Sequence, residues 1–102
     1  MTEHLQTLSF SITQKAKKQI QTWIGKIVIP DPILTIAWIA DVTPAGDGSG
    51  HWAFLISANN PRKKNATVTI DGIDIYLPIS QDEARMIQDK TIDSIDSHLT
   101  FI

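Results

Sequence analysis

The sequence contains no cysteine. This absence excludes disulfide bridges, a thiolate nucleophile, a zinc–thiolate centre and an iron–sulfur cluster held by cysteines of this chain. No apolar run approaches the roughly 20 residues of a membrane-spanning helix, and the chain opens without a basic segment followed by an apolar one. We therefore expect no membrane association and a cytoplasmic location. The net charge of −2 creates no strong attraction for nucleic acid, so we predict no nucleic-acid partner.

The 102 residues carry no internal repeat and no linker, which predicts a single domain over residues 1–102. Alternating apolar residues predict strands over 8–12, 51–58, 68–70, 73–77, 91–95 and 99–102. The segment 33–40 is apolar on both faces, as in a strand that is covered on both sides. An apolar stripe predicts a helix over 14–26, whereas 43–50 reads as a glycine-rich loop and 59–65 as a polar, basic turn.

Two short motifs predict local structure most strongly. Asp71-Gly72 lies between two alternating apolar runs, and Asp-Gly in that setting is typical of a two-residue β-hairpin, because both turn residues take positive φ. Ser80 followed by Glu83 is the pattern of a capping box, which predicts a short second helix ending near Asp89. Runs of adjacent strands with two helices indicate an α+β fold with mainly antiparallel or mixed sheets.

The order of several motifs resembles the A-type iron–sulfur carrier family, the HesB/IscA-like proteins. Ile12-Thr13 with Ala16 resembles the family's I-T-x-x-A start, and the strands around Asp71-Gly72 resemble its V-x-x-D-G pair. Lys90-Thr91-Ile92-Asp93 and Leu99-Thr100-Phe101 resemble its G-x-x-I-D-Y and G-F-x-F segments. The resemblance covers most of the chain and implies a sandwich-like fold with an N-terminal helix and a short second helix.

The resemblance also implies a ligand set that this sequence does not have. Family members hold their cluster or iron with one cysteine in the glycine-rich loop and two near the C-terminus. Gly48 stands at the loop position, and the other two would fall beyond Ile102. We therefore expect a member of the fold without cluster ligands, with no cofactor and no bound metal.

Other residues give only weak indications of a metal-binding or catalytic site. His51, Asp47 and His98 are conceivable metal ligands, although no spacing places two of them on one face, and solvated loop residues are the simpler interpretation. No nucleophile elbow surrounds the serines near His51, and the loop 46–50 lacks the ending of a phosphate-binding P-loop. We predict that the chain is not an enzyme.

These observations favour a non-catalytic domain that binds another protein, such as an assembly factor. Trp52 at the exit of the loop is expected to be partly exposed, as interface aromatics are. The predicted contact surface combines the loop with the C-terminal segment and comprises Asp47, Gly48, Ser49, His51, Trp52, Asp93, Asp96 and His98. The alternative is a small immunity protein that neutralises a basic toxin, such as a nuclease, with Asp41, Asp47, Asp82, Glu83, Asp89, Asp93 and Asp96 facing cationic groups. A weaker alternative is binding of a metal or a cluster through histidine and aspartate.

Overall fold

The computed structural model describes residue 5 and residues 7–40 and 50–102. Its elements are β1 (Ser11–Ile12), α2 (Gln14–Lys26), β2 (Pro32–Ala40), β3 (Gly50–Ala58), the 3-10 helix η1 (Pro61–Ala66), β4 (Thr67–Ile70), β5 (Ile73–Tyr76), α3 (Gln81–Ile87), β6 (Thr91–Ile95) and β7 (His98–Phe101). The fold is α+β, as the sequence predicts. Among the described residues, no helix is long and apolar enough to span a membrane.

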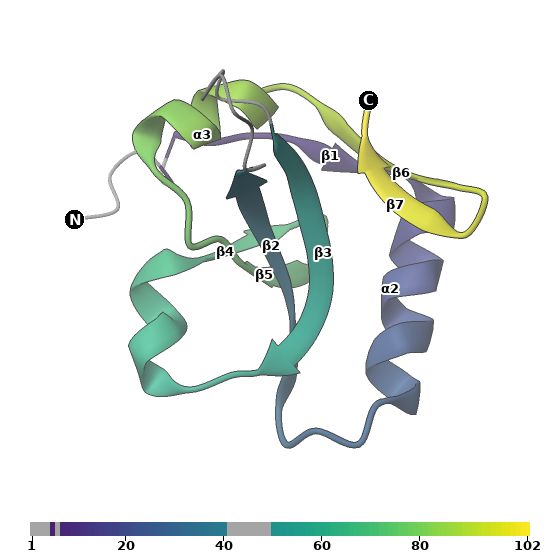
Figure 1. The fold of residues 1–102 in the computed structure, drawn as a ribbon. Helices are drawn as coiled ribbons and strands as arrows, with labels where there is room; N and C mark the ends of the chain where they lie inside the picture. The colour runs from purple at the N-terminus through teal and green to yellow at the C-terminus, as the bar shows by residue number, and fades with distance from the viewer. Residues whose placement is uncertain (1–4, 6, 41–49) are drawn as a thin grey trace.

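The strands form two mixed sheets. The larger sheet has the order β3-β2-β5-β4, with β2 and β5 parallel and the other two pairs antiparallel. The smaller sheet has the order β1-β6-β7, in which β1 pairs with β6 in parallel and β7 is antiparallel to β6. Helix α2 packs against both β2 and β6 and thereby joins the sheets, and η1 lies on the opposite side of the larger sheet (Figure 1).

The hairpin prediction is confirmed. Asp71 and Gly72 have φ values of 51° and 82°, and Ile70 pairs with Ile73 across the turn. Aspartate tolerates this left-handed conformation better than most residues, and glycine adopts it at no steric cost. The two turn residues therefore set the register of β4 against β5.

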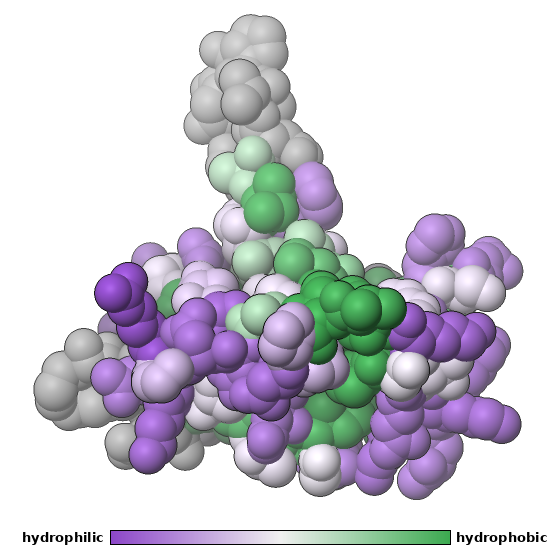
Figure 2. All heavy atoms as spheres, turned by 90° about the horizontal axis from the view of Figure 1, so that it is seen from below, coloured by the Kyte–Doolittle hydropathy of each residue, from purple (hydrophilic) through white to green (hydrophobic). Residues whose placement is uncertain are grey.

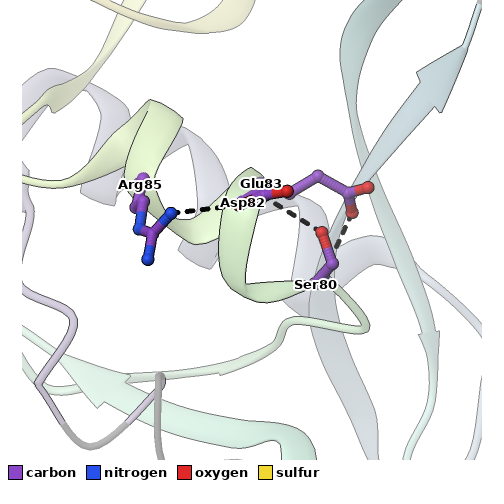
Figure 3. Close-up of polar contacts among 4 residues, drawn as sticks. All are labelled: Ser80, Asp82, Glu83 and Arg85. Atoms are coloured by element: carbon purple, nitrogen blue, oxygen red, sulfur yellow. Dashed lines mark hydrogen bonds and ion pairs between the residues drawn. The ribbon is translucent and has the colours of Figure 1, made fainter.

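The capping box is also confirmed. The Ser80 side chain accepts a hydrogen bond from the Glu83 amide, and the Glu83 carboxylate accepts one from the Ser80 amide, each at 3.2 Å (Figure 3). Helix α3 ends at Ile87, two residues before the predicted end near Asp89. Asp89 has a φ of 61°, which is incompatible with continuing a right-handed helix.

Two predicted elements differ from the structure. The strand expected over 8–12 is paired only at Ser11–Ile12, although Leu8 and Phe10 are buried, because burial alone gives the backbone no partner strand. The turn expected over 59–65 is instead η1. Proline at its first position and the Asn60 side chain, which accepts from the Arg62 amide, favour a helical start.

The first half of β2 is covered on both faces, whereas its second half is not. Leu34 and Ile36 are fully buried in the core between the sheets, and Ile33 on the other face is also buried. Ile39, on the same face as Ile33, is 44% exposed. The prediction of a doubly covered strand is thus wrong for the end of β2, because η1 covers the outer face only near the opposite end.

Lys63 fixes η1 to that outer face. Its ammonium group donates to the Ser57 hydroxyl at 3.1 Å and to the Ala58 carbonyl at 2.5 Å, and it lies 5.0 Å from the centroid of the Tyr76 ring. Ser57 in turn shares a hydrogen bond of 2.6 Å with Thr35. This lysine is therefore engaged in holding the structure together.

Candidate interaction surface

The described residues of the predicted contact surface lie in three places, one of which is Asp93 in β6. Asp47, Gly48 and Ser49 lie outside the described residues. His51 and Trp52 begin β3, at the exit of the predicted loop. Asp96 and His98 lie at the turn between β6 and β7.

Trp52 belongs to an aromatic cluster that bridges the two sheets. We define this aromatic cluster as Phe10, Trp38, Trp52, Phe54 and Phe101. The centroid of the Trp52 ring lies 5.2 Å from that of Trp38 and 5.5 Å from that of Phe101, both in edge-to-face geometry. Phe101 also contacts Phe10 and Phe54, at centroid distances of 5.6 and 5.5 Å. The start of β3 therefore meets the end of β7.

The aromatic cluster is only partly shielded from solvent. Phe10 is buried, but Trp38, Trp52, Phe54 and Phe101 are all half-buried. Trp52 is thus partly exposed, as expected from its position, and is also packed against the core. Half-buried aromatic rings of this kind supply large, rigid contact area at protein interfaces.

The turn residues are not part of this cluster. His98 and Phe101 lie at opposite ends of β7, about 10 Å apart along an extended strand. His98 pairs with Ile95 beside the turn, and the carbonyl of Ser97 accepts a hydrogen bond from Gln19 of α2. Asp96 and His98 consequently face a different part of the molecule from Trp52.

Asp93 serves a structural role within the smaller sheet. Its carboxylate accepts a hydrogen bond of 2.8 Å from the Thr13 hydroxyl and another of 2.8 Å from the Ser94 amide. These two hydrogen bonds, with the charge of Lys15, lower the pKa of Asp93 below its ordinary value of 3.8. The carboxylate is therefore engaged in stabilising the start of α2.

The motifs that carry the family resemblance contact one another at this point. The Ile12 amide donates to the Asp71 carboxylate at 3.0 Å, and the Thr13 amide donates to the Ile92 carbonyl at 3.0 Å. The Thr13 hydroxyl donates to Asp93 and accepts from the Ala16 amide at 3.1 Å. Three segments far apart in the sequence are thus tied together at the N-terminus of α2.

Within the described part of the chain, the structure bears on the residues named for metal binding and on some of those named for toxin inhibition. No group of three or more histidine, aspartate or glutamate side chains there can hold a metal ion. Asp82 pairs with Arg85 at 3.1 Å and Glu83 closes the capping box, as Figure 3 shows. Asp93 is engaged with Thr13. Several of the acidic groups invoked for an inhibitor therefore have local partners.

The sequence does not reveal that the outer edge of β3 is open. Strand β3 lies at the end of the larger sheet, and within residues 50–102 and the preceding described segments no strand pairs with its other side. The alternation of Trp52, Phe54 and Ile56 identifies which face is buried, but it carries no information about which neighbours a strand has. Only the sheet order reveals the open edge.

A groove lies beside this edge. Trp23, Lys26 and Ile27 at the end of α2 face Phe54, Leu55 and Ile56 of β3 across a cavity of about 340 Å³. On the face seen from below, apolar atoms gather in a band between polar atoms on either side (Figure 2). Val28, which follows directly after Ile27, is 99% exposed. We call this cavity the α2–β3 groove.

No protein-family model matches the chain, and a search of curated proteins finds no match.

Proposed function

We propose that this chain is a non-catalytic protein-binding domain, built on a scaffold like that of the A-type carriers but without their cluster ligands. The observation that carries the proposal is the open edge of β3, together with the half-buried rings of the aromatic cluster beside it. A long strand edge and exposed aromatic surface are features through which proteins bind other proteins. The hydrogen bonds of Ile12 with Asp71 and of Thr13 with Asp93 support the scaffold part of the proposal.

The binding surface centres on β3 and on the end of β7. Leu55 lies in β3 and is 45% exposed, which makes it a suitable position to disrupt binding without removing core packing. Ile95 in β6 has nearly the same exposure, 48%, and lies away from this edge, beside the β6–β7 turn. Replacing each with lysine adds the same charge to two apolar surface positions, of which only one belongs to the proposed surface.

The test first captures candidate partner proteins and then measures the binding of each purified partner. Tagged wild-type chain, Leu55→Lys and Ile95→Lys are used to capture proteins from an extract of the source cells, and each captured protein is then purified and titrated against all three by calorimetry. We expect a partner that binds the wild type and Ile95→Lys alike and binds Leu55→Lys at least about tenfold more weakly. A failure of every captured protein to bind the purified wild type contradicts the proposal.

The same experiment addresses the inhibitor alternative. If the purified partner is a basic enzyme, its activity is measured with and without the wild-type chain. Loss of activity at stoichiometric chain identifies an immunity protein, whereas unchanged activity indicates an assembly partner or scaffold.

A further inference from the structure

Strand β3 has none of the devices that protect a long strand edge. Its nine residues pair with β2 one to one without a bulge, and they include no lysine, arginine, aspartate, glutamate or proline. Natural sheets protect exposed edges with such charges, prolines, bulges or short strands. The other edge strands of the two sheets follow that rule, since β1, β4 and β7 have only two, four and four residues. The edge of β3 is therefore suited to accept an added strand.

The α2–β3 groove offers apolar pockets alongside this edge. An added strand would point every second side chain toward the face that carries Phe54 and Ile56, because side chains alternate along a strand. Trp23 and Ile27 of α2 form the opposite wall. A partner segment with apolar residues at alternate positions matches this arrangement.

One basic residue, Lys26, lines the groove. It is the last residue of α2, which contains four lysines and no acidic residue. Helix η1, by contrast, lies on the other face of the larger sheet, where Lys63 is bonded to Ser57 and Ala58. The local charge thus favours an acidic occupant.

This charge distribution argues against a second copy of the chain as the occupant. Two identical strands paired antiparallel in one sheet are related by a two-fold axis perpendicular to the sheet, so their equivalent faces lie on the same side. The two α2 helices, each with four lysines and no acidic residue, would then share one face beside the joined edge. Like charges brought together in this way oppose association.

We propose that β3 binds an extended segment of a partner protein as an added strand, with alternate apolar side chains in the α2–β3 groove and a carboxylate beside Lys26. The inference rests on the proposed function and specifies the partner chemistry at the same surface. Main-chain hydrogen bonds would supply affinity, and the groove together with Lys26 would supply specificity.

A library of random peptides displayed on phage tests this chemistry directly. The peptides have about ten residues, which spans β3. We expect the enriched peptides to alternate apolar and polar residues and to carry aspartate or glutamate near one end. The best peptide is synthesised in two forms, methylated on the backbone nitrogens of either the even or the odd positions. An added strand uses only one of these two sets, so one form should bind and the other should not. Equal binding by both forms, or loss of binding by both, contradicts strand addition.

Matched charge reversals test the role of Lys26. Lys26 and Lys18 are both exposed lysines of α2, but only Lys26 lines the groove. We expect Lys26→Glu to weaken binding of the synthetic peptide about three- to thirtyfold. Lys18→Glu should change the affinity for the peptide less than about twofold. Equal effects of the two reversals overturn the proposal that Lys26 lies beside an acidic residue of the bound segment. If no peptide is enriched while a captured protein still binds the wild type and fails with Leu55→Lys, the inference is wrong and the proposed function stands.

Discussion

The replacement Trp52→Ala measures how far the candidate surface is also part of the core. Truncating a fully buried tryptophan costs about 3–5 kcal/mol. Trp52 is half-buried, so about 2 kcal/mol is expected from lost burial. Its edge-to-face contacts with Trp38 and Phe101 each add about 0.5–1.5 kcal/mol. Because these contributions overlap, we expect a loss of about 2–4 kcal/mol, against a total stability of about 5–15 kcal/mol for a domain of this size.

Urea unfolding followed by far-UV circular dichroism gives this free energy, since the substitution removes one of the fluorescent residues. The control is Leu55→Ala in the same strand, where a 45% exposed side chain should cost less than about 1 kcal/mol. A loss below about 1 kcal/mol for Trp52→Ala would refute the claim that this ring couples the two sheets. Complete unfolding would show that Trp52 is a core residue and remove it from the proposed interface.

A double-mutant cycle tests the contact between the sheets separately. The variants Trp52→Ala, Phe101→Leu and their combination are unfolded under the same conditions. We expect a coupling free energy of about 0.5–1.5 kcal/mol, because the two rings are in contact. Strict additivity would mean that the rings contribute only through their separate burial.

Four other substitutions test the local structure. Ser80→Ala should lower the free energy of unfolding by about 0.5–2 kcal/mol, measured by urea titration, because it removes the N-cap acceptor of α3. Gly25→Ala should raise the melting temperature, with a gain of up to about 1 kcal/mol, since a Cβ there meets no atom within 4 Å. Gly72→Ala, at a φ of 82°, should cost about 1–2 kcal/mol, and a stabilising effect would contradict the turn geometry. Thr13→Val removes a hydrogen bond that lowers the pKa of Asp93 below 3.8. In the wild type, the ionised Asp93 carboxylate stabilises the fold above that pH. This contribution to stability is lost as the pH falls through the pKa of Asp93 in the folded state. The difference in unfolding free energy between wild type and Thr13→Val should therefore narrow below about pH 4, and a difference independent of pH would exclude the Asp93 contact as its source.

Local interactions explain which elements could be predicted from the sequence. The Asp71-Gly72 turn and the Ser80 capping box depend on residues no more than three positions apart, and both are present as predicted. The prediction of a turn over 59–65 is wrong because a polar, basic composition does not distinguish a turn from the 3-10 helix that begins at Pro61. The loop part of the candidate surface, Asp47 to Ser49, lies outside the described residues and remains a prediction.

The sequence by itself determined the hairpin, the two helices, the buried faces of the strands and the absence of thiol chemistry, because each depends on composition or on neighbouring residues. The tertiary structure decided the order of strands and the contact of Trp52 with Phe101. It also decided that Asp93 binds Thr13, a residue 80 positions away, and that β3 has an open edge. The physical reason is that a period of two in the apolar pattern specifies which face of a strand is buried, whereas its neighbours are set by long-range packing of the whole chain.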